Sequence, residues 1–431
     1  MTNSSFKTVV IWNGISQLGS SGIQFLSTII LARMLSPDDF AIIGIVTIFM
    51  TLASMMVDSE MGGALLRKEN VSIIDYSTLF FYNLIVSAFI YLSFFFLAPF
   101  IAIFYKQPEL TSVIRILSLS IIIHAFRIVQ QIIIFRDLDF KAFAIINVVC
   151  GLISLIIAII SAYNGLRYWS LIIQTISMAL LMTVSLSVYN RFIPILKFSY
   201  QSFKYQFNFG ISLLGSDIIK TIANNISTNI VAKITTLEQT GYYTQASRIP
   251  NFCQGFIGSI LNQSIFPLLA KEKDEKALRY KHNKLILYII LITSLFTLAF
   301  IFFSPQIITI VLGEKWLPAA PYFVILCLST IPLSLQMLER NFLKAVGMTK
   351  LVLKLETTKS IIVIGLLLAS SLFNLYALIW ATSISQVISS FIWIYETNKK
   401  NAYLKSQRFN ILFLLIMILM GLFALLYLYY L

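Results

Sequence analysis

The chain has 431 residues, of which 58% are hydrophobic and only 12% are charged, and its formal net charge is +14. Apolar runs of about 20 residues recur from end to end, and a run of that length crosses the ~30 Å hydrocarbon core of a bilayer as a helix. This composition excludes a soluble protein and indicates an integral membrane protein. The excess of Lys and Arg therefore needs an explanation other than nucleic-acid binding.

Thirteen apolar runs follow one another, and each predicts a helix. The first, from about Val9 to Leu31, has one preceding Lys and no small-residue cleavage site, so it predicts a retained helix and not a signal peptide. The first half contains predicted helices over residues 8–32, 40–65, 77–104, 112–135, 143–163 and 168–188. The second half contains predicted helices over residues 206–232, 241–268, 284–303, 320–343, 351–373 and 375–396, and an extra one over 409–430. The predicted fold is an all-α membrane protein with 12–14 helices.

An internal repeat relates the two halves of the chain. The segment Gly14–Ser20 returns as Gly210–Ser216, 196 residues later, with six of seven residues identical. A duplicated unit in a membrane protein predicts two lobes around a central site, as in many transporters. The predicted domains are a six-helix lobe over 1–190, a cytoplasmic amphipathic linker over 191–205, a second six-helix lobe over 206–397, and a basic loop with an additional helix over 398–431.

The Lys and Arg residues between the predicted helices concentrate on alternate connecting segments. If the N-terminus is cytoplasmic, the basic residues of the outside loops are only Arg33, Lys106, Arg167, Lys233 and Lys315. Cytoplasmic loops of membrane proteins are enriched in Lys and Arg, so this distribution predicts a cytoplasmic N-terminus. The positive charge is therefore interpreted as a topology signal.

Polar residues inside the predicted helices fall on single faces, where they point to a neighbouring helix or to water. The helix over 8–32 carries such a stripe, which includes Ser20, and the 196-residue shift places part of it on the helix over 206–232. The helices over 40–65 and 241–268 carry similar stripes, so we expect these four helices to line one polar cavity between the lobes. The residues expected to line this cavity are Gln17, Gln24, Thr28, Thr51, Asn224 and Asn251. The alternative is that small polar residues only join helices, at about 0.6 kcal/mol each.

Hydrogen bonding between helices does not readily explain the charged residues within the predicted helices. A charge at the centre of a spanning helix costs roughly 2.5–3.5 kcal/mol even on the lenient insertion scale. Asp217 and Lys220 lie three residues apart, so they either neutralise each other or serve the cavity. Arg248 has no such neighbour within its own helix.

Arg127 is a further charge, roughly 13 Å from the cytoplasmic end of its helix at 1.5 Å per residue. It either pairs, with Asp58 or Glu60, or lines the inner side of the cavity. Two further sets of charges are predicted as local ion pairs, namely Glu339 with Arg340, and Glu356 with Lys359.

The sequence contains no motif for catalysis. A GxxxxGK[ST] phosphate loop is absent, so we expect no ATP hydrolysis on this chain. His124 and His282 have no HExxH or Cys partner, so we expect no metal site. Cys150, Cys253 and Cys327 lie in apolar runs and are predicted to be small core residues. The sequence therefore predicts a protein that is not an enzyme and uses no cofactor.

Several strings resemble bacterial polysaccharide exporters, the Wzx-like oligosaccharide flippases of the polysaccharide transporter family. They are Leu31–Phe40 (LARMLSPDDF), Asp58–Leu66 with its GGALL, Phe135–Lys141 (FRDLDFK), Gly241–Arg248 with its GYY, and Phe266–Leu269 (FPLL). The resemblance covers roughly residues 8–396. The extra run over 409–430 departs from the even number of helices usual in that family.

The resemblance implies two six-helix bundles that rock about a central cationic cavity in the bacterial cytoplasmic membrane. It implies that they flip an undecaprenyl-diphosphate-linked oligosaccharide, for capsule, O-antigen or exopolysaccharide, from the cytoplasmic to the outer leaflet. Carried over by position, Arg248, Lys220 and Arg127 would be the substrate-binding cations, and a counter-ion would act through Asp58 or Asp217. The implied partners are this lipid-linked substrate, membrane lipid, and the polymerase and glycosyltransferases of the pathway, without nucleic acid.

Two other functions are alternatives to this one. A multidrug/cation antiporter of the same superfamily has the same two lobes, but it needs unpaired carboxylates where this sequence offers Arg248. An O-antigen polymerase or ligase needs a sizeable extracytoplasmic loop. The largest loops here, over 189–205 and 269–283, are both predicted to be cytoplasmic.

Overall fold

The computed structural model describes residues 3–58, 61–261, 265, 269, 274–400 and 407–430, and within them the regular secondary structure is entirely helical. All thirteen predicted runs contain a helix. The chain forms two compact units, residues 1–225 and 226–431. The division between residues 225 and 226 falls inside the helix predicted over 206–232. The predicted lobe boundaries at 190 and 206 therefore stay a prediction.

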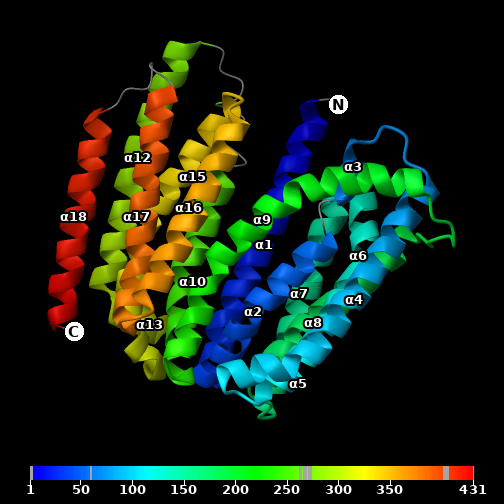
Figure 1. Cartoon of the computed structure of the whole chain (residues 1–431), viewed down its shortest axis with the longest axis horizontal. Coiled ribbons are helices and arrows are strands. Elements are labelled where there is room, and N and C mark those ends of the chain that lie inside the picture. Colours follow the sequence, from blue (N-terminus) through cyan, green and yellow to red (C-terminus); the bar gives the residue numbers. More distant parts are fainter. Residues whose placement is uncertain are drawn as a thin grey trace. The chain divides into compact units, whose positions relative to one another are not determined.

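Unit 1 contains eight helices that lie before the connection to unit 2. They are α1 (Asn3–Met34), α2 (Pro37–Asp58), α3 (Met61–Arg67), α4 (Ile73–Tyr105), α5 (Glu109–Leu117), α6 (Leu119–Arg136), α7 (Phe140–Tyr163) and α8 (Trp169–Asn190). In this unit α7 packs between α1 and α8, while α6 packs against α4 and α8 (Figure 1). Its largest buried cluster joins α2, α4 and α6 through residues such as Val57, Leu79 and Ile121.

The connection is α9 (Tyr200–Ile234), and unit 2 follows it. Its elements are α10 (Leu237–Ile260), α12 (Glu275–Phe302), α13 (Ser304–Val311), the 3₁₀ helix η2 (Glu314–Ala319), α14 (Ala320–Cys327), α15 (Thr330–Ala345), α16 (Thr349–Ser370), α17 (Leu375–Lys400) and α18 (Gln407–Tyr430). Here α15 is central, because α10, α12, α16 and α17 all pack against it.

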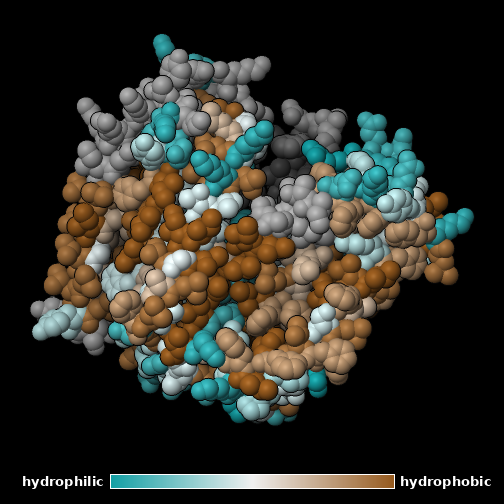
Figure 2. Space-filling view, in the orientation of Figure 1, coloured by the Kyte–Doolittle hydropathy of each residue, from teal (hydrophilic) through white to brown (hydrophobic). Residues whose placement is uncertain are grey.

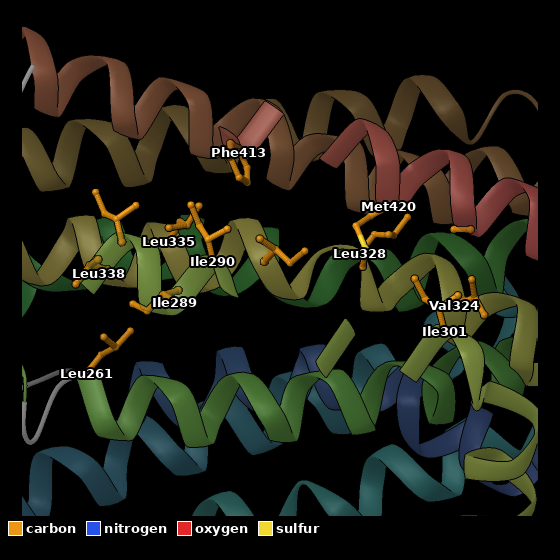
Figure 3. Close-up of a cluster of buried hydrophobic side chains, with 13 residues drawn as sticks. Leu261, Ile289, Ile290, Ile301, Val324, Leu328, Leu335, Leu338, Phe413 and Met420 are labelled. Carbon is orange, nitrogen blue, oxygen red and sulfur yellow. The ribbon is translucent and has the colours of Figure 1, made fainter. Parts of the chain in front are cut away.

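The extra C-terminal helix α18 packs on the outside of unit 2, along α12 and α14. Its Phe413 and Met420 are buried and point at α12, α14 and α15, where they meet Ile290, Leu328 and Leu335 (Figure 3). The Tyr427 hydroxyl donates a hydrogen bond to the Phe302 carbonyl at the end of α12. The thirteenth run is therefore an integral part of unit 2.

The fourth and tenth predicted helices are each interrupted at a serine, which the sequence did not predict. In the tenth, Pro332 also lacks the N–H that would bond to the Leu328 carbonyl. The run over 112–135 breaks at Ser118, whose hydroxyl donates to the Arg115 carbonyl over 3.1 Å. The run over 320–343 breaks at Leu328 and Ser329, and the Ser329 hydroxyl donates to the Leu326 carbonyl over 2.6 Å. Serine hydroxyls that bond back to a carbonyl in the preceding turn bend helices. The same break in corresponding helices of both halves is structural support for the internal repeat.

The outer faces of the helices suit a bilayer. Phe89, Phe96 and Phe100 of α4 are 66–70% exposed, and residues at this spacing share one face. On the side drawn in Figure 2, hydrophobic residues cover the flanks of the helices and hydrophilic residues gather towards their ends. Eight described helical segments are long and apolar enough to cross a membrane, and nine if the bent pair over 314–327 and 330–345 forms one span. The protein is therefore a multi-pass membrane protein.

Basic loops meet at one end of unit 1. Arg136, after the fourth run, donates to the carbonyls of Leu65, Lys68 and Glu69, after the second run, over 2.5, 2.6 and 3.1 Å. These are the loops predicted to be cytoplasmic. At a different set of loops, Arg167 pairs with Asp39 over 3.3 Å. The helices of this unit therefore alternate in the way that the charge pattern predicts.

The predicted linker over 191–205 lies along the same end of unit 1. Its backbone donates to Ser77 Oγ from Ile195 and to Thr78 Oγ1 from Ser199. Asp75 accepts hydrogen bonds from Ser202 Oγ over 2.6 Å and from Lys68 Nζ over 2.8 Å. The start of α9 is therefore attached to α4.

Candidate substrate-binding site

The predicted charges of unit 1 form a cluster where α2 meets α6. The Asp58 carboxylate lies 3.4 Å from His124 Nε2, and Arg127 Nη2 lies 3.1 Å from His124 Nδ1. His124 therefore contacts both Arg127 and Asp58, one of the two partners that the sequence offered for Arg127. Glu60, the other predicted partner of Arg127, lies outside the described residues.

The Arg127 guanidinium contacts both nitrogens of the His124 ring. Its Nη2 lies 3.1 Å from Nδ1 and 3.4 Å from Nε2, the nitrogen that also faces Asp58. A guanidinium only donates hydrogen bonds, so the imidazole accepts from Arg127. The Asp58 side chain is 47% exposed, and Arg127 Nε is buried without a hydrogen-bond partner in the described chain. The cluster is thus a cation held beside a histidine, with a carboxylate open to the surroundings. His124 lies three residues before Arg127, so the sequence already places the two residues on the same helical face, but not the contact with Asp58.

The polar stripe of α1 separates into two adjacent lines with different surroundings. Ser16 and Ser20 both accept hydrogen bonds from the Asn147 side-chain amide of α7, over 3.2 and 2.6 Å. Ser27 exchanges hydrogen bonds with Gln174 of α8, over 2.8 and 3.1 Å. These three serines join helices, which is the alternative interpretation of the stripe.

Gln17 and Gln24 lie about 60–80° further round the same helix and are exposed. Thr28 lies in line with them but is 4% exposed, and its hydroxyl donates to the Gln24 carbonyl. Thr51 of α2 is half-buried and donates to the Thr47 carbonyl. The open polar face of α1 therefore consists of its two glutamines, and Thr28 does not contribute to it.

This separation makes a prediction about Asn147. We expect Asn147→Ala to lower the stability of unit 1 by about 0.6–1.7 kcal/mol, the range for hydrogen bonds between membrane helices. We expect transport to be unchanged, because the lost bonds face α1 and not an open surface. Thermal unfolding in detergent and a transport assay would measure the two effects. Gln24→Ala is the matched control, and it should leave the unfolding temperature unchanged.

α9 and α10 carry the other predicted residues. Lys220 is half-buried and Asn224 is exposed on α9, while Arg248 is half-buried and Asn251 is exposed on α10. Arg248 also interacts with other groups of the protein. The side chain of Asp217 lies outside the described residues, so its pairing with Lys220 stays a prediction.

Three of the helices that carry predicted cavity residues are less apolar than most of the candidate spans. Neither α9 nor α10 reaches the apolarity of a simple spanning helix, and α1 only just does so, with the lowest mean hydropathy of the eight candidate spans. A helix that is polar on one face and belongs to a membrane bundle must turn that face to protein or to water. The exposed polar residues of these helices therefore mark faces that suit an aqueous path.

The buried charges of unit 2 are paired differently from the prediction of local pairs. Glu339 does not pair with its neighbour Arg340, because it lies 3.2 Å from His282 of α12. Arg340 forms its ion pair with Glu356 of α16. Adjacent residues on a helix point in directions about 100° apart, so each of them meets a different neighbouring helix.

Comparison with known sequences identifies a family that matches most of the chain. A sequence model described as "polysaccharide biosynthesis protein" matches residues 30–321. The chain is 26% identical over 373 residues to an uncharacterized membrane protein in the cps region of Klebsiella pneumoniae, covering 84% of this chain and 76% of that protein. It is 23% identical over 322 residues to the succinoglycan biosynthesis transport protein ExoT of Rhizobium meliloti, covering 74% of this chain and 65%, just under two thirds, of ExoT.

Comparison with solved structures shows the fold. The lipid II flippase MurJ in an inward closed conformation superposes with a TM-score of 0.75 at 16% identity, covering 96% of this chain and 97% of that one. An inward-facing multidrug resistance transporter of the MATE family superposes with a TM-score of 0.68 at 12% identity, covering 93% of this chain and 99% of that one. The chain therefore has the fold of two helical bundles that these transporters share.

Proposed function

Because the chain belongs to the polysaccharide biosynthesis protein family, we propose that it flips undecaprenyl-diphosphate-linked oligosaccharides across the bacterial cytoplasmic membrane. The oligosaccharide repeat unit of a capsule, O-antigen or exopolysaccharide would move from the cytoplasmic to the outer leaflet. The chain would act by alternating access, as a transporter and not as an enzyme. Its relatives with named roles support this, since ExoT is a transport protein of succinoglycan biosynthesis.

The observation that carries the proposal is the set of exposed polar faces on helices of a membrane bundle. Gln17 and Gln24 on α1, Asn224 on α9 and Asn251 on α10 are all exposed, and the half-buried cations Lys220 and Arg248 lie one turn away from the two asparagines. We propose that these faces line the substrate path, with Arg127 on its inner side. Asp58 and Asp217 are the proposed positions for a coupling ion.

The chemistry of the substrate requires such a path. Removing water from an ionised group costs tens of kcal/mol in the Born limit, so a diphosphate-sugar head group does not cross hydrocarbon unaided. Fixed cations and polar side chains replace that water, while the lipid tail stays in the bilayer. Export of two negative charges is favoured by about 4–5 kcal/mol at 100 mV, inside negative, at about 2.3 kcal/mol per charge. The membrane potential can therefore drive export without ATP.

The second candidate is a multidrug/cation antiporter, which the MATE fold likeness favours. The two candidates require opposite charges in the path. Proteoliposomes distinguish them if they contain either a fluorescent polyprenyl-diphosphate-linked sugar or a fluorescent cationic dye. We expect faster transbilayer movement of the lipid and no pH-driven dye movement. Dye movement without lipid movement would replace the flippase proposal by the antiporter.

The proposed direction of transport depends on orientation, which a reporter fusion tests. We expect alkaline phosphatase fused after residue 200 to be inactive and green fluorescent protein fused there to be fluorescent, because both outcomes indicate the cytoplasm. A matched fusion after Lys106, in a loop predicted to be outside, should give the reverse pattern. Active phosphatase after residue 200 would show that the loops are inverted.

A further inference from the structure

A buried histidine–carboxylate pair joins α12 to α15 in unit 2. His282 Nε2 lies 3.2 Å from Glu339 Oε1, and the side chains are only 3% and 1% exposed. Other ion pairs in the described chain are more open: Lys68 is 36% exposed beside Asp75, and Arg340 is 22% exposed beside Glu356. A pair enclosed to this degree within a membrane bundle needs either a structural or a functional reason.

The surroundings of the pair are apolar. The ring of Phe342 lies 4.2 Å from the His282 ring, and Phe342 belongs to a buried cluster with Leu269, Leu278 and Leu285. Within the described residues, neither ring nitrogen of His282 nor Glu339 Oε2 has a hydrogen-bond partner, so the contact between Nε2 and Oε1 is one of distance and charge. A purely structural polar pair normally has its remaining donors and acceptors satisfied, because each unsatisfied buried group is costly.

Several described charges on the packed elements are engaged elsewhere or face outward. Arg340 is bound to Glu356, Tyr427 of α18 bonds to the Phe302 carbonyl, and Lys344, Lys350 and Lys354 are exposed. Titratable residues of the remaining neighbours include Arg248 and Cys253 on α10, Cys327 on α14, Lys359 on α16, and Glu396 and Lys399 on α17. In the described structure none of these forms an ion pair or a hydrogen bond with His282 or Glu339.

These conditions fix the proton content of the closed pair. With one titratable proton on the pair it has no net charge, whether it exists as imidazolium and carboxylate or as two neutral groups. Gaining or losing a proton would leave one uncompensated charge in an apolar site, which is strongly unfavourable. Exchange with water therefore requires that α12 and α15 separate.

We propose that His282 and Glu339 form a proton-binding site, which holds one proton while α12 and α15 are packed and exchanges it with water when they separate. On release the proton passes to water and leaves a carboxylate beside a neutral imidazole. The site would couple proton movement to the conformational cycle, and this coupling rests on the proposed transport function. The proton binding itself does not depend on that function.

The binding site is tested by histidine NMR, because the chain contains only two histidines. The full-length protein is labelled with ring-¹⁵N histidine in lipid nanodiscs, and the His282 signals are assigned by their loss in His282→Gln. We expect these signals to stay unchanged from pH 5 to pH 8, and to shift in Glu339→Gln. Titration of His282 as an open imidazole, or signals unaffected by Glu339→Gln, would overturn the proposal.

Coupling is tested separately with a pH indicator in weakly buffered nanodiscs, after addition of a polyprenyl-diphosphate-linked N-acetylglucosamine. We expect about one proton to be exchanged per wild-type chain and at least tenfold less for Glu339→Gln. The double variant His282→Gln/Glu339→Gln replaces the pair by two neutral amides, so it controls for misfolding caused by a single unpaired group. It should behave like Glu339→Gln. Glu356→Gln, which removes the neighbouring ion pair, is the control and should match the wild type.

The two failures have different signatures. If the wild type neither binds the lipid nor exchanges a proton, but the NMR result holds, the transport function is wrong and the proton site stands. If Glu339→Gln exchanges as many protons as the wild type, the proton site is wrong whatever the transport result.

Discussion

Arg248→Ala is expected to abolish complementation of a capsule- or O-antigen-flippase deletion while the protein still inserts into the membrane. Arg248 lies on α10 one turn before the exposed Asn251, so both point towards the same side of the helix. A charge-assisted hydrogen bond to a diphosphate is worth about 1.5–3 kcal/mol, so its loss should lower substrate affinity about 10- to 100-fold. Surface glycan, measured by immunoblot, reports the outcome.

Two further variants separate charge from folding in this experiment. Arg248→Lys keeps the positive charge but loses the planar two-pronged donor geometry, so it should retain partial function. Lys233→Ala removes an exposed cation at the end of α9 and should leave surface glycan at the wild-type level. Normal glycan in the Arg248→Ala strain would remove Arg248 from the substrate path.

Asp75→Ala is expected to produce the largest loss of stability. The Asp75 side chain is 6% exposed and accepts hydrogen bonds from Lys68 Nζ, Ser202 Oγ and the Ser72 backbone, over 2.8, 2.6 and 2.8 Å. It also completes the capping box at the start of α4. Removing it leaves these donors without their acceptor, at an expected cost of about 2–4 kcal/mol in the free energy of unfolding.

The same substitution should release the start of α9 from α4. The connecting segment 191–199 has no helical structure, and protease should cleave it faster once Ser202 loses its hydrogen bond to the Asp75 carboxylate. Thermal unfolding in detergent and limited proteolysis measure the two effects. Asp137→Ala is the control, because Asp137 is exposed at the same end of unit 1. Equal unfolding temperatures for the two variants would contradict the role given to Asp75.

The helices were predictable because hydrophobic runs and loop charges report directly on burial in lipid. The breaks at Ser118 and Ser329 were not, since serine is common in these runs and only its hydrogen bond to a carbonyl reveals the bend. The stripe on α1 was visible, but a rotation of only about 40° around the helix separates Ser20, which meets Asn147, from Gln24, which stays exposed. Sequence spacing does not resolve such a difference without the neighbouring helices.

Pairing between helices was the least predictable feature. Glu339 and Arg340 are adjacent in sequence, which suggested that they pair with each other. Glu339 instead pairs with His282 of α12, before α15, and Arg340 pairs with Glu356 of α16, after it. His124 was visible on the stripe of Arg127, yet its position between Arg127 and Asp58 depends on how α2 packs on α6. Tertiary packing sets these contacts, and one sequence does not contain their distances.

The central claim, that exposed polar faces of both units line the path of a lipid-linked anion, is tested most directly by cysteine labelling. Cys150, Cys253 and Cys327 are first replaced by Ala, and single cysteines are then introduced at Gln24, Asn251 and, as the lipid-facing control, Phe96. We expect a membrane-impermeant thiol reagent to label positions 24 and 251, and a polyprenyl-diphosphate-linked sugar to protect both. Position 96 should not react with the reagent, either before or after addition of the substrate. Labelling of 24 and 251 that the substrate leaves unchanged, or no labelling at either position, would contradict the claim.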